Sequence, residues 1–384
     1  MQTKRQIVDV RLAAQPRRYR VHIGRDLLDN VGDQTRECLG PQSSRVAIIS
    51  NQTVFDLYGA RVVKSLEASD FLVASWLMGD GERFKSLVTL QKALQFLSSA
   101  GLERADSVIA LGGGVVGDLA GFAAAIYLRG IPLIQVPTTV IAQIDSAVGG
   151  KTAVNLRAGK NLVGAFHQPR TVIADVETIK TLPARELVSG WCEAIKNGAV
   201  GSRDLFDQTV MFLSTLKSGT AAHSARALPA LIKAHCTFKA EIVRHDERED
   251  AKRTDNRSRR VLNFGHTIGH ALEALTRYRR FRHGEAVGHG MLVAGEISKN
   301  LGLLAASELT LLREAVRMCG PLPPAADLAP REIMDLVRTD KKIVGGEVQW
   351  VLLKGIGKPR IVAGKEIPSP LIRDALIRGL GTIA

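Results

Sequence analysis

The sequence has few aromatic residues, no paired cysteines and no long apolar run, and each shortage excludes a class of protein. Aromatic side chains make up 5% of the 384 residues, too few for a surface that stacks single-stranded nucleic acid. The four cysteines form no CxxC pair, so we expect free thiols in a reducing cytoplasm. The longest uncharged apolar stretches, such as Leu119 to Leu128, are far shorter than a membrane span. Met1 to Leu12 lacks the apolar core of a signal peptide.

Basic residues outnumber acidic residues, and the formal net charge is +14. Such a balance attracts nucleic acid, an anionic lipid surface or a small anionic substrate. The basic residues are dispersed, and the densest run, Lys252 to Arg260, is interrupted by Asp255 and Asn256. We therefore expect a small anionic substrate, with neither nucleic acid nor a membrane as partner. A strong, salt-dependent shift with arbitrary DNA would favour the nucleic-acid alternative instead.

The first half of the chain alternates short apolar runs with helical patterns, which is typical of a Rossmann-like α/β domain around a parallel sheet. We expect this dinucleotide-binding domain to cover residues 1–182. Helices fit between the strands, for example over Val54 to Leu66 and Leu87 to Ser98. The predicted strands are Gln6 to Leu12, Tyr19 to Ile23, Val46 to Ser50, Leu72 to Leu77, Ser107 to Leu111, Leu133 to Val136 and Thr171 to Ala174.

After Pro183 longer helical patterns dominate, and they predict a mainly α-helical, metal- and substrate-binding domain over residues 183–384. A single late strand is expected at Val348 to Leu353, and the proline-rich segment Gly320 to Pro330 is expected to separate two helices. The predicted helices are Arg185 to Val200, Asp204 to Lys217, Leu228 to His245, His266 to Leu275 and Glu285 to Leu301.

Three histidines, His266, His270 and His283, lie close together in the second half of the chain. Because His266 and His270 are four residues apart, they share one face of a helix. Neutral imidazoles bind divalent metals of the zinc type, and catalytic zinc sites commonly have three protein ligands. Capping or core histidines are the alternative, but glycines flank these three. The residues themselves therefore predict a metal centre with the three histidines as candidate ligands.

A glycine-rich run, Gly112 to Asp118, directly follows the predicted strand Ser107 to Leu111. Glycines at a strand end let the backbone approach a pyrophosphate, and the next helix points its N-terminal N–H groups at that charge. The run is not GxGxxG, so a plain tight turn is the alternative. Thr138 and Thr139 follow the next predicted strand and add two hydroxyls at the same sheet edge. The two strand ends together favour a dinucleotide site.

Two further segments carry charged candidates. Lys151 and Lys160 each follow a glycine, and such lysines can hold phosphate or carboxylate oxygens; solvated lysines in a loop are the alternative. Glu193 and Lys196 lie three apart in an apolar helical segment, where an unpaired carboxylate is costly. A metal or an ion pair would relieve that cost, and the segment alone does not separate the two.

The combination of motifs resembles 3-dehydroquinate synthase over most of residues 45–355, in the order of that family. The motifs are GDGERFK, GGGVVGDLAGFAAAIYLRG, QVPTT, AVGGKTAVN, GKNLVGAFHQP, CEAIKNG, KAEIV, LNFGHTIGHALE, HGEAV and TDKK. The resemblance implies a cytoplasmic homodimer of the shikimate pathway that binds NAD and Zn²⁺ or Co²⁺. It implies a lyase that converts 3-deoxy-D-arabino-heptulosonate 7-phosphate into 3-dehydroquinate and phosphate through transient oxidation by NAD, β-elimination, re-reduction and intramolecular aldol closure.

The resemblance also implies roles for single residues. It gives the metal ligands as Glu193, His266 and His283 and assigns His270 to proton transfer, which removes His270 from the three-histidine set. Glu249 matches a second acid/base position. The implied NAD contacts are Asn51, Glu82, Lys85, Gly113, Gly114, Val115, Asp118, Thr138, Thr139 and Lys160. The implied substrate contacts are Arg129, Asp145, Lys151, Asn161, Lys196, Lys239, Arg259, Asn263 and Lys341.

The chain departs from the family pattern in two places. Asn197 stands where family members commonly have tyrosine, and the polar, basic segment Asp250 to Ser258 lengthens the chain between Glu249 and Arg259. We expect this segment to form an exposed loop. Two enzyme alternatives are another NAD- and metal-dependent sugar-phosphate cyclase and an iron-type alcohol dehydrogenase. The substrate-contact positions fit the synthase better than either.

Overall fold

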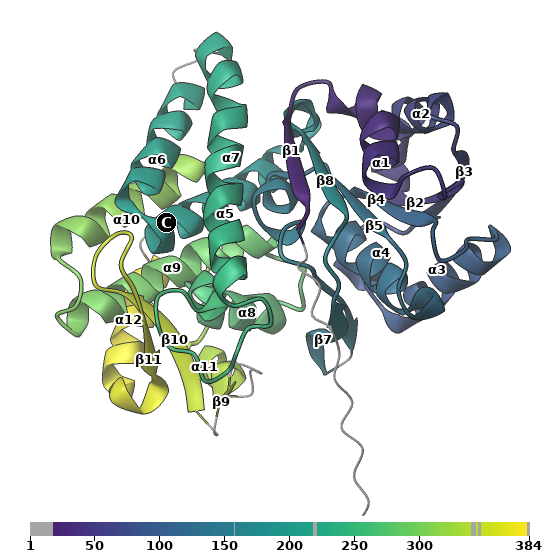
Figure 1. Ribbon diagram of the computed structural model, residues 1–384. Coiled ribbons are helices and arrows are strands. Elements are labelled where there is room, and N and C mark those ends of the chain that lie inside the picture. The colour runs from purple at the N-terminus through teal and green to yellow at the C-terminus, as the bar shows by residue number, and fades with distance from the viewer. Residues whose placement is uncertain (1–17, 157, 218–220, 339–342, 345–346, 382–384) are drawn as a thin grey trace, which may run out of the picture.

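The structure, a computed structural model, describes residues 18–156, 158–217, 221–338, 343–344 and 347–381, and a sheet-based part and a helical part lie side by side in it (Figure 1). Six parallel strands form the main sheet in the order β1-β8-β5-β4-β2-β3. Six of the seven predicted strands are confirmed, and the seventh, at 6–12, lies outside the described residues. The strands are β1 (Arg20–Gly24), β2 (Arg45–Asn51), β3 (Leu72–Met78), β4 (Ser107–Gly112), β5 (Leu133–Pro137) and β8 (Thr171–Asp175).

Helices cover both faces of this sheet because its central strands are apolar on both sides. In β2, Val46 and Ile48 belong to the core shared with α1 and α2, whereas Ala47 and Ile49 belong to the core shared with α3 and α4. This alternation follows from the two-residue period of a strand. The helices are α1 (Val31–Leu39), α2 (Gln52–Ala68), α3 (Leu87–Ser99) and α4 (Gly114–Ile126).

An antiparallel hairpin of β6 (Lys151–Leu156) and β7 (Gly159–Phe166) packs against α4. The sequence predicts no strand here, because glycine and polar residues interrupt the apolar alternation. Lys151, Lys160 and Asn161 therefore sit on paired strands, which hold their backbone more firmly than a loop would.

All five predicted helices of the second half are present, and three further helices follow them within the described residues. The largest core cluster gathers residues from most of these helices and from the late strands. Among the residues that the structure describes, no helix combines the length and apolar character that a membrane crossing requires. The helices are α5 (Ala184–Gly201), α6 (Arg203–Lys217), α7 (Ala221–His245), α8 (His266–Leu275), α9 (His283–Asn300), α10 (Ala306–Cys319), α11 (Pro330–Arg338) and α12 (Ser369–Gly381).

The late strand is not alone, which corrects the sequence-based expectation. A three-stranded antiparallel sheet consists of β9 (Ile343–Val344), β10 (Glu347–Leu353) and β11 (Pro359–Ala363). β10 matches the predicted strand, whereas its partners are too short to give a clear periodic pattern. The segment between α10 and α11 separates the two helices as expected.

Candidate active site

Three helices bring Glu193, His266 and His283 together. Glu193 lies in the middle of α5, whereas His266 and His283 are the first residues of α8 and α9. One ligand atom from each of the three lies within 4.8 Å of the others. Oε1 of Glu193 is 3.9 Å from Nε2 of His266 and 3.7 Å from Nε2 of His283. These residues, here called the metal group, converge on one point.

Glycines let the helices that carry the metal group approach one another. A Cβ atom at Gly290 would lie 1.9 Å from the backbone oxygen of Gly265, and one at Gly284 would lie 1.9 Å from the backbone oxygen of Ser189. Gly265, which precedes α8, also has φ +79°, a conformation that favours glycine. The glycines beside the histidines therefore serve helix packing.

The metal group fits a divalent cation. Glu193 is buried, and its Oε2 lies 2.9 Å from Nζ of Lys196. Its Oε1 has no hydrogen-bond partner among the described residues. A buried carboxylate oxygen without a partner is costly, and a cation between this oxygen and the two imidazoles would remove the cost. One carboxylate and two imidazoles are ligands that suit Zn²⁺ and Co²⁺.

Glu273 is a member of this region that the sequence analysis missed. Its Oε2 accepts a hydrogen bond from Nδ1 of His283 at 3.1 Å, and its Oε1 accepts one from Nζ of Lys160 at 2.8 Å. Burial would raise the pKa of Glu273, but His283 and Lys160 hold this pKa well below its ordinary value. Glu273 follows His266 by seven residues and His270 by three, so its place on the same helix face was a signal that could have found it.

A cavity of about 750 Å³ lies between the β6–β7 hairpin and α8, and it reaches β10 and β11. Its volume lies in the range of small-molecule sites, about 300–1,000 Å³. The predicted site residues that line it are Asp118, Lys151, Lys160, Asn161, Glu249, Asn263 and His270. Lining residues that the sequence analysis did not single out include Arg248, Arg260, Thr267, Glu273 and Tyr278.

His270 stands beside the metal group and faces the cavity. Its ring centroid is 5.4 Å from that of His266 and 5.9 Å from that of His283. His270, Glu273 and His283 also offer ligand atoms within 4.8 Å of one another. Both oxygens of Glu273 already have partners, however, whereas Oε1 of Glu193 has none. The metal group is therefore the better site for a cation than the set His270, Glu273 and His283.

Lys196 connects the metal group to Asp145. Its Nζ lies 2.9 Å from Oε2 of Glu193 and 2.9 Å from Oδ2 of Asp145. Burial opposes the charge of Lys196, but Asp145 and Glu193 outweigh burial and raise the pKa of this lysine. Lys239, on α7, also donates to Asp145, and burial lowers the pKa of Lys239 to about 8 despite the carboxylate. The carboxylate of Asp145 thus contacts both Lys196 and Lys239.

Lys151 and Glu249 form an ion pair at the cavity wall. Nδ2 of Asn263 donates to Oε1 of Glu249 at 3.5 Å. Burial would raise the pKa of Glu249, but Lys151 outweighs burial and lowers it. Glu249 has φ +55°, and non-glycine residues in this conformation cluster at functional sites. The segment at 250–258 forms mostly exposed turns, as expected, and leaves Glu249 on the cavity wall.

Five of the predicted NAD contacts lie at the carboxyl ends of β4 and β5: Gly113, Gly114, Val115, Thr138 and Thr139. Gly114 and Val115 begin α4, whose N-terminus has no side-chain cap, so its N–H groups suit a phosphate. A Cβ atom at Gly113 would lie 3.0 Å from Cγ2 of Thr139. Oγ1 of the buried Thr138 has no partner among the described residues. These features fit a dinucleotide pyrophosphate.

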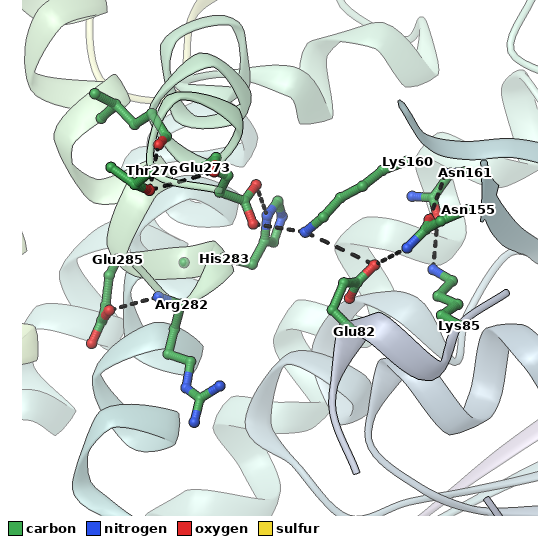
Figure 2. Close-up of polar contacts among 12 residues, drawn as sticks. Glu82, Lys85, Asn155, Lys160, Asn161, Glu273, Thr276, Arg282, His283 and Glu285 are labelled. Carbon is green, nitrogen blue, oxygen red and sulfur yellow. Dashed lines mark hydrogen bonds and ion pairs between the residues drawn. The ribbon is translucent and has the colours of Figure 1, made fainter. Parts of the chain in front are cut away.

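Glu82 and Lys85 link this sheet edge to the hairpin, as Figure 2 shows. Lys85 donates to Asp118, and to Oδ1 of Asn161 at 2.6 Å. Glu82 lies 3.9 Å from Nζ of Lys160. Residues predicted to bind NAD and residues predicted to bind substrate thus form one network.

Arg259 does not line the cavity, although a substrate contact was predicted for it. Its side chain is 1% exposed and donates to the backbone oxygens of Glu247 at 2.8 Å and Gly149 at 2.9 Å. The next residue, Arg260, lines the cavity instead and donates to the backbone oxygen of Ala251 at 3.0 Å.

Three further predicted contacts lie away from the cavity or outside the described residues. Arg129 is exposed on a turn with φ +68°. Asn51 caps α2 by accepting a hydrogen bond from the backbone N–H of Val54. Lys341 lies outside the described residues. Asn197, at the departure from the family pattern, is fully buried, and its amide has no partner among the described residues.

Comparison with known proteins identifies related families and structures. The family models 3-dehydroquinate synthase N-terminal and 3-dehydroquinate synthase C-terminal match residues 75–189 and 190–343. A 3-dehydroquinate synthase of Pelotomaculum thermopropionicum is 44% identical over 370 residues, 96% of this chain and 95% of the relative. A 2-epi-5-epi-valiolone synthase of Streptomyces hygroscopicus subsp. jinggangensis, solved with NAD⁺ and Zn²⁺, has a TM-score of 0.82 at 25% identity and covers 97% and 100% of the two chains. A 2-deoxy-scyllo-inosose synthase complexed with carbaglucose-6-phosphate, NAD⁺ and Co²⁺ has a TM-score of 0.77 at 26% identity and covers 94% and 96%.

Proposed function

We propose that this chain, which belongs to the 3-dehydroquinate synthase family, converts 3-deoxy-D-arabino-heptulosonate 7-phosphate into 3-dehydroquinate and inorganic phosphate as a carbon–oxygen lyase. The observation that supports this most is the metal group with its unpartnered carboxylate oxygen, close to a cavity lined by lysines. The sequence is 44% identical to a synthase but only 25% and 26% identical to the two other cyclases. This difference supports the synthase over another NAD- and metal-dependent cyclase.

Glu193, His266 and His283 would hold Zn²⁺ or Co²⁺, and the N-terminus of α4 with Gly113 and Thr138 would hold NAD. Bound there, the ion supplies a Lewis acid and NAD a transient hydride acceptor. The two solved cyclases carry NAD⁺ with Zn²⁺ or Co²⁺, which supports the same cofactors in this chain. The hairpin and α8 would exclude water from the substrate between them.

His270 and Glu249 are the proposed acid/base residues. His270 lines the cavity, whereas His266 and His283 do not, so its imidazole is the one that can exchange a proton with the substrate. Glu249 lines the same cavity and is held by Lys151 and Asn263. Two positioned proton-transfer groups, an imidazole and a carboxylate, are what a sequence of elimination and ring closure requires.

The cavity lysines and amides would hold the anionic substrate. Lys151, Asn161 and Asn263 present donors to the cavity for phosphate or carboxylate oxygens. Lys196 and Lys239 would contribute charge from beside Asp145, which keeps both lysines in place.

We further propose a cytoplasmic homodimer with two domains per chain, divided between Leu182 and Pro183. The four cysteines are free, which suits a reducing compartment. Arg129 does not line the cavity of its own chain, so a contact from the partner copy would suit it. Sedimentation of the purified protein should give a dimer, and a fully active monomer would contradict this assembly.

The test is phosphate release from the heptulosonate phosphate by purified protein with NAD, before and after chelation. We expect release that chelation stops and added Zn²⁺ or Co²⁺ restores. His283→Ala should lose both metal and turnover, whereas the control His289→Gln, on the same helix, should keep its metal. Phosphate release from another sugar phosphate, with none from the heptulosonate, would favour the cyclase alternative.

A further inference from the structure

We propose that Glu273 is a positioning residue that orients His283 for the metal and ties this ligand to Lys160. The proposal rests on the proposed function, because it concerns the metal group that this function requires. The sequence resemblance assigns no role to Glu273. The contacts around it carry the argument.

The imidazole of His283 lies between two carboxylates. Its Nδ1 is 3.1 Å from Oε2 of Glu273, and its Nε2 is 3.7 Å from Oε1 of Glu193. An ionised carboxylate only accepts hydrogen bonds, so Nδ1 of His283 carries the proton and donates the hydrogen bond to Glu273. The lone pair of Nε2 is then directed to the Glu193 side, where the metal group converges. A carboxylate behind a histidine ligand commonly fixes the ring in this way.

Glu273 is itself held on its other oxygen. Its side chain is 3% exposed, and Oε1 accepts a hydrogen bond from Nζ of Lys160 at 2.8 Å. Lys160 in turn lies 3.9 Å from Glu82 and 4.5 Å from the centre of the Tyr278 ring. Figure 2 shows Lys160 between Glu82 and Glu273, with the His283 ring beside Glu273. Because both of its oxygens are engaged, the carboxylate cannot rotate without breaking a contact.

The rival is a direct ligand role for Glu273 in a site with His270 and His283. That site would leave Oε1 of Glu193 without a partner, and it would require Glu273 to give up its contacts with His283 or Lys160. The observed contacts therefore favour the positioning role.

The experiment measures the affinity of the full chain for Zn²⁺ and for Co²⁺ by competition with a chelator. Glu273→Gln keeps an acceptor for Nδ1 but loses the charge, and we expect its affinity to fall about 10- to 100-fold. Glu273→Ala should lose more and change the visible absorption spectrum of bound Co²⁺. The matched control is Glu296→Gln, which also removes a buried carboxylate from an ion pair on α9, about 20 Å along the helix from His283.

Each outcome decides the proposal. Equal metal affinity in Glu273→Gln and Glu296→Gln would overturn it. His270→Ala should keep its metal; loss of metal from both His270→Ala and Glu273→Gln would establish the rival site. If Glu273→Gln does not fold, Glu273→Asp replaces it in the same measurement of metal affinity. Its shorter side chain cannot reach both His283 and Lys160, so the same fall in affinity is expected. A wild-type chain that binds no metal would instead overturn the metal premise of the proposed function, and this role with it.

Discussion

The metal group and the lysines of the site differ in how their charges are partnered. Glu193 keeps one oxygen without a hydrogen-bond partner and presents it to two imidazoles. The lysines, in contrast, already have acids beside them: Lys151 pairs with Glu249, and Lys239 pairs with Asp145. These two pairs are called the lysine group below. The metal group has a carboxylate oxygen that lacks a partner and that a cation would satisfy. Each lysine of the lysine group, in contrast, already has a carboxylate partner.

The two groups should therefore bind their ligands differently. A cation can contact Oε1 of Glu193 without displacing a hydrogen bond from this oxygen, so this ligand atom is available in advance and the affinity of the site depends on the ligands themselves. An anion that reaches the lysine group competes with carboxylates of the protein. Metal binding should therefore respond steeply to ligand loss, whereas anion binding should respond mildly and can even improve when an acid is removed.

The largest effect is expected from Glu193→Gln. An amide oxygen is a much poorer ligand than a carboxylate, so we expect metal affinity to fall by more than about 100-fold, beyond the loss typical of outer-shell residues. Metal-dependent turnover should disappear. Metal analysis after gel filtration is the measurement, with Glu296→Gln as control. A variant with full metal content would show that the two groups do not differ as argued.

Lys196→Met should produce the next largest effect, because Lys196 contacts Glu193 of the metal group and Asp145 of the lysine group. The lysine is 1% exposed, and its loss leaves the buried Glu193 and the partly buried Asp145 without their shared cation. Removing one partner of a buried pair costs about 3–5 kcal/mol. Urea denaturation should show a loss of this size, whereas Lys180→Met, in the exposed pair with Glu177, should lose less than about 1 kcal/mol. Equal losses in the two variants would contradict the linking role.

The sequence predicted features that depend on neighbours along the chain. The buried strands of the main sheet were found because β2, β4 and β5 are apolar along most of their length. The metal group was predicted because three histidines lie close together beside glycines, and because the family resemblance added Glu193 and assigned His270 to proton transfer. The side-chain types alone indicated a metal centre, but they did not select its ligands among the three histidines.

Features that depend on distant contacts were missed. Lys160 meets Glu273 across 113 residues, and Lys151 meets Glu249 across 98 residues, so no local pattern shows either pair. The hairpin that carries both lysines was missed for the same reason, because its packing against α4 stabilises strands that look polar in sequence. The direction of the Arg259 side chain likewise depends on backbone oxygens at Gly149 and Glu247.

A smaller effect is expected from His235, which lies fully buried on α7. Burial, and then the charge of Lys196, lowers the pKa of His235 to about 3 from 6.5. Below pH 6.5, His235 is protonated in the unfolded chain, whereas in the folded chain it stays neutral until about pH 3. This contribution to stability is therefore complete above pH 6.5 and is lost as the pH falls, by about 1.4 kcal/mol at pH 5.5. His235→Gln should show a smaller drop in unfolding free energy between pH 7.5 and 5.5; equal drops would show that His235 does not titrate as argued.

The smallest effect, and the one that tests the lysine group directly, is expected from Glu249→Gln. Removing this carboxylate frees Lys151 from its partner, and pairs of such exposure are worth about 0.2–1 kcal/mol. Inorganic phosphate should therefore bind up to about fivefold more tightly by calorimetry, although kcat should fall because Glu249 is a proposed acid/base residue. Glu247→Gln, two residues away and exposed, is the matched control and should change neither quantity. Weaker phosphate binding in Glu249→Gln would mean that the carboxylate positions Lys151 for the anion. The lysine group, like the metal group, would then be organised before its ligand binds.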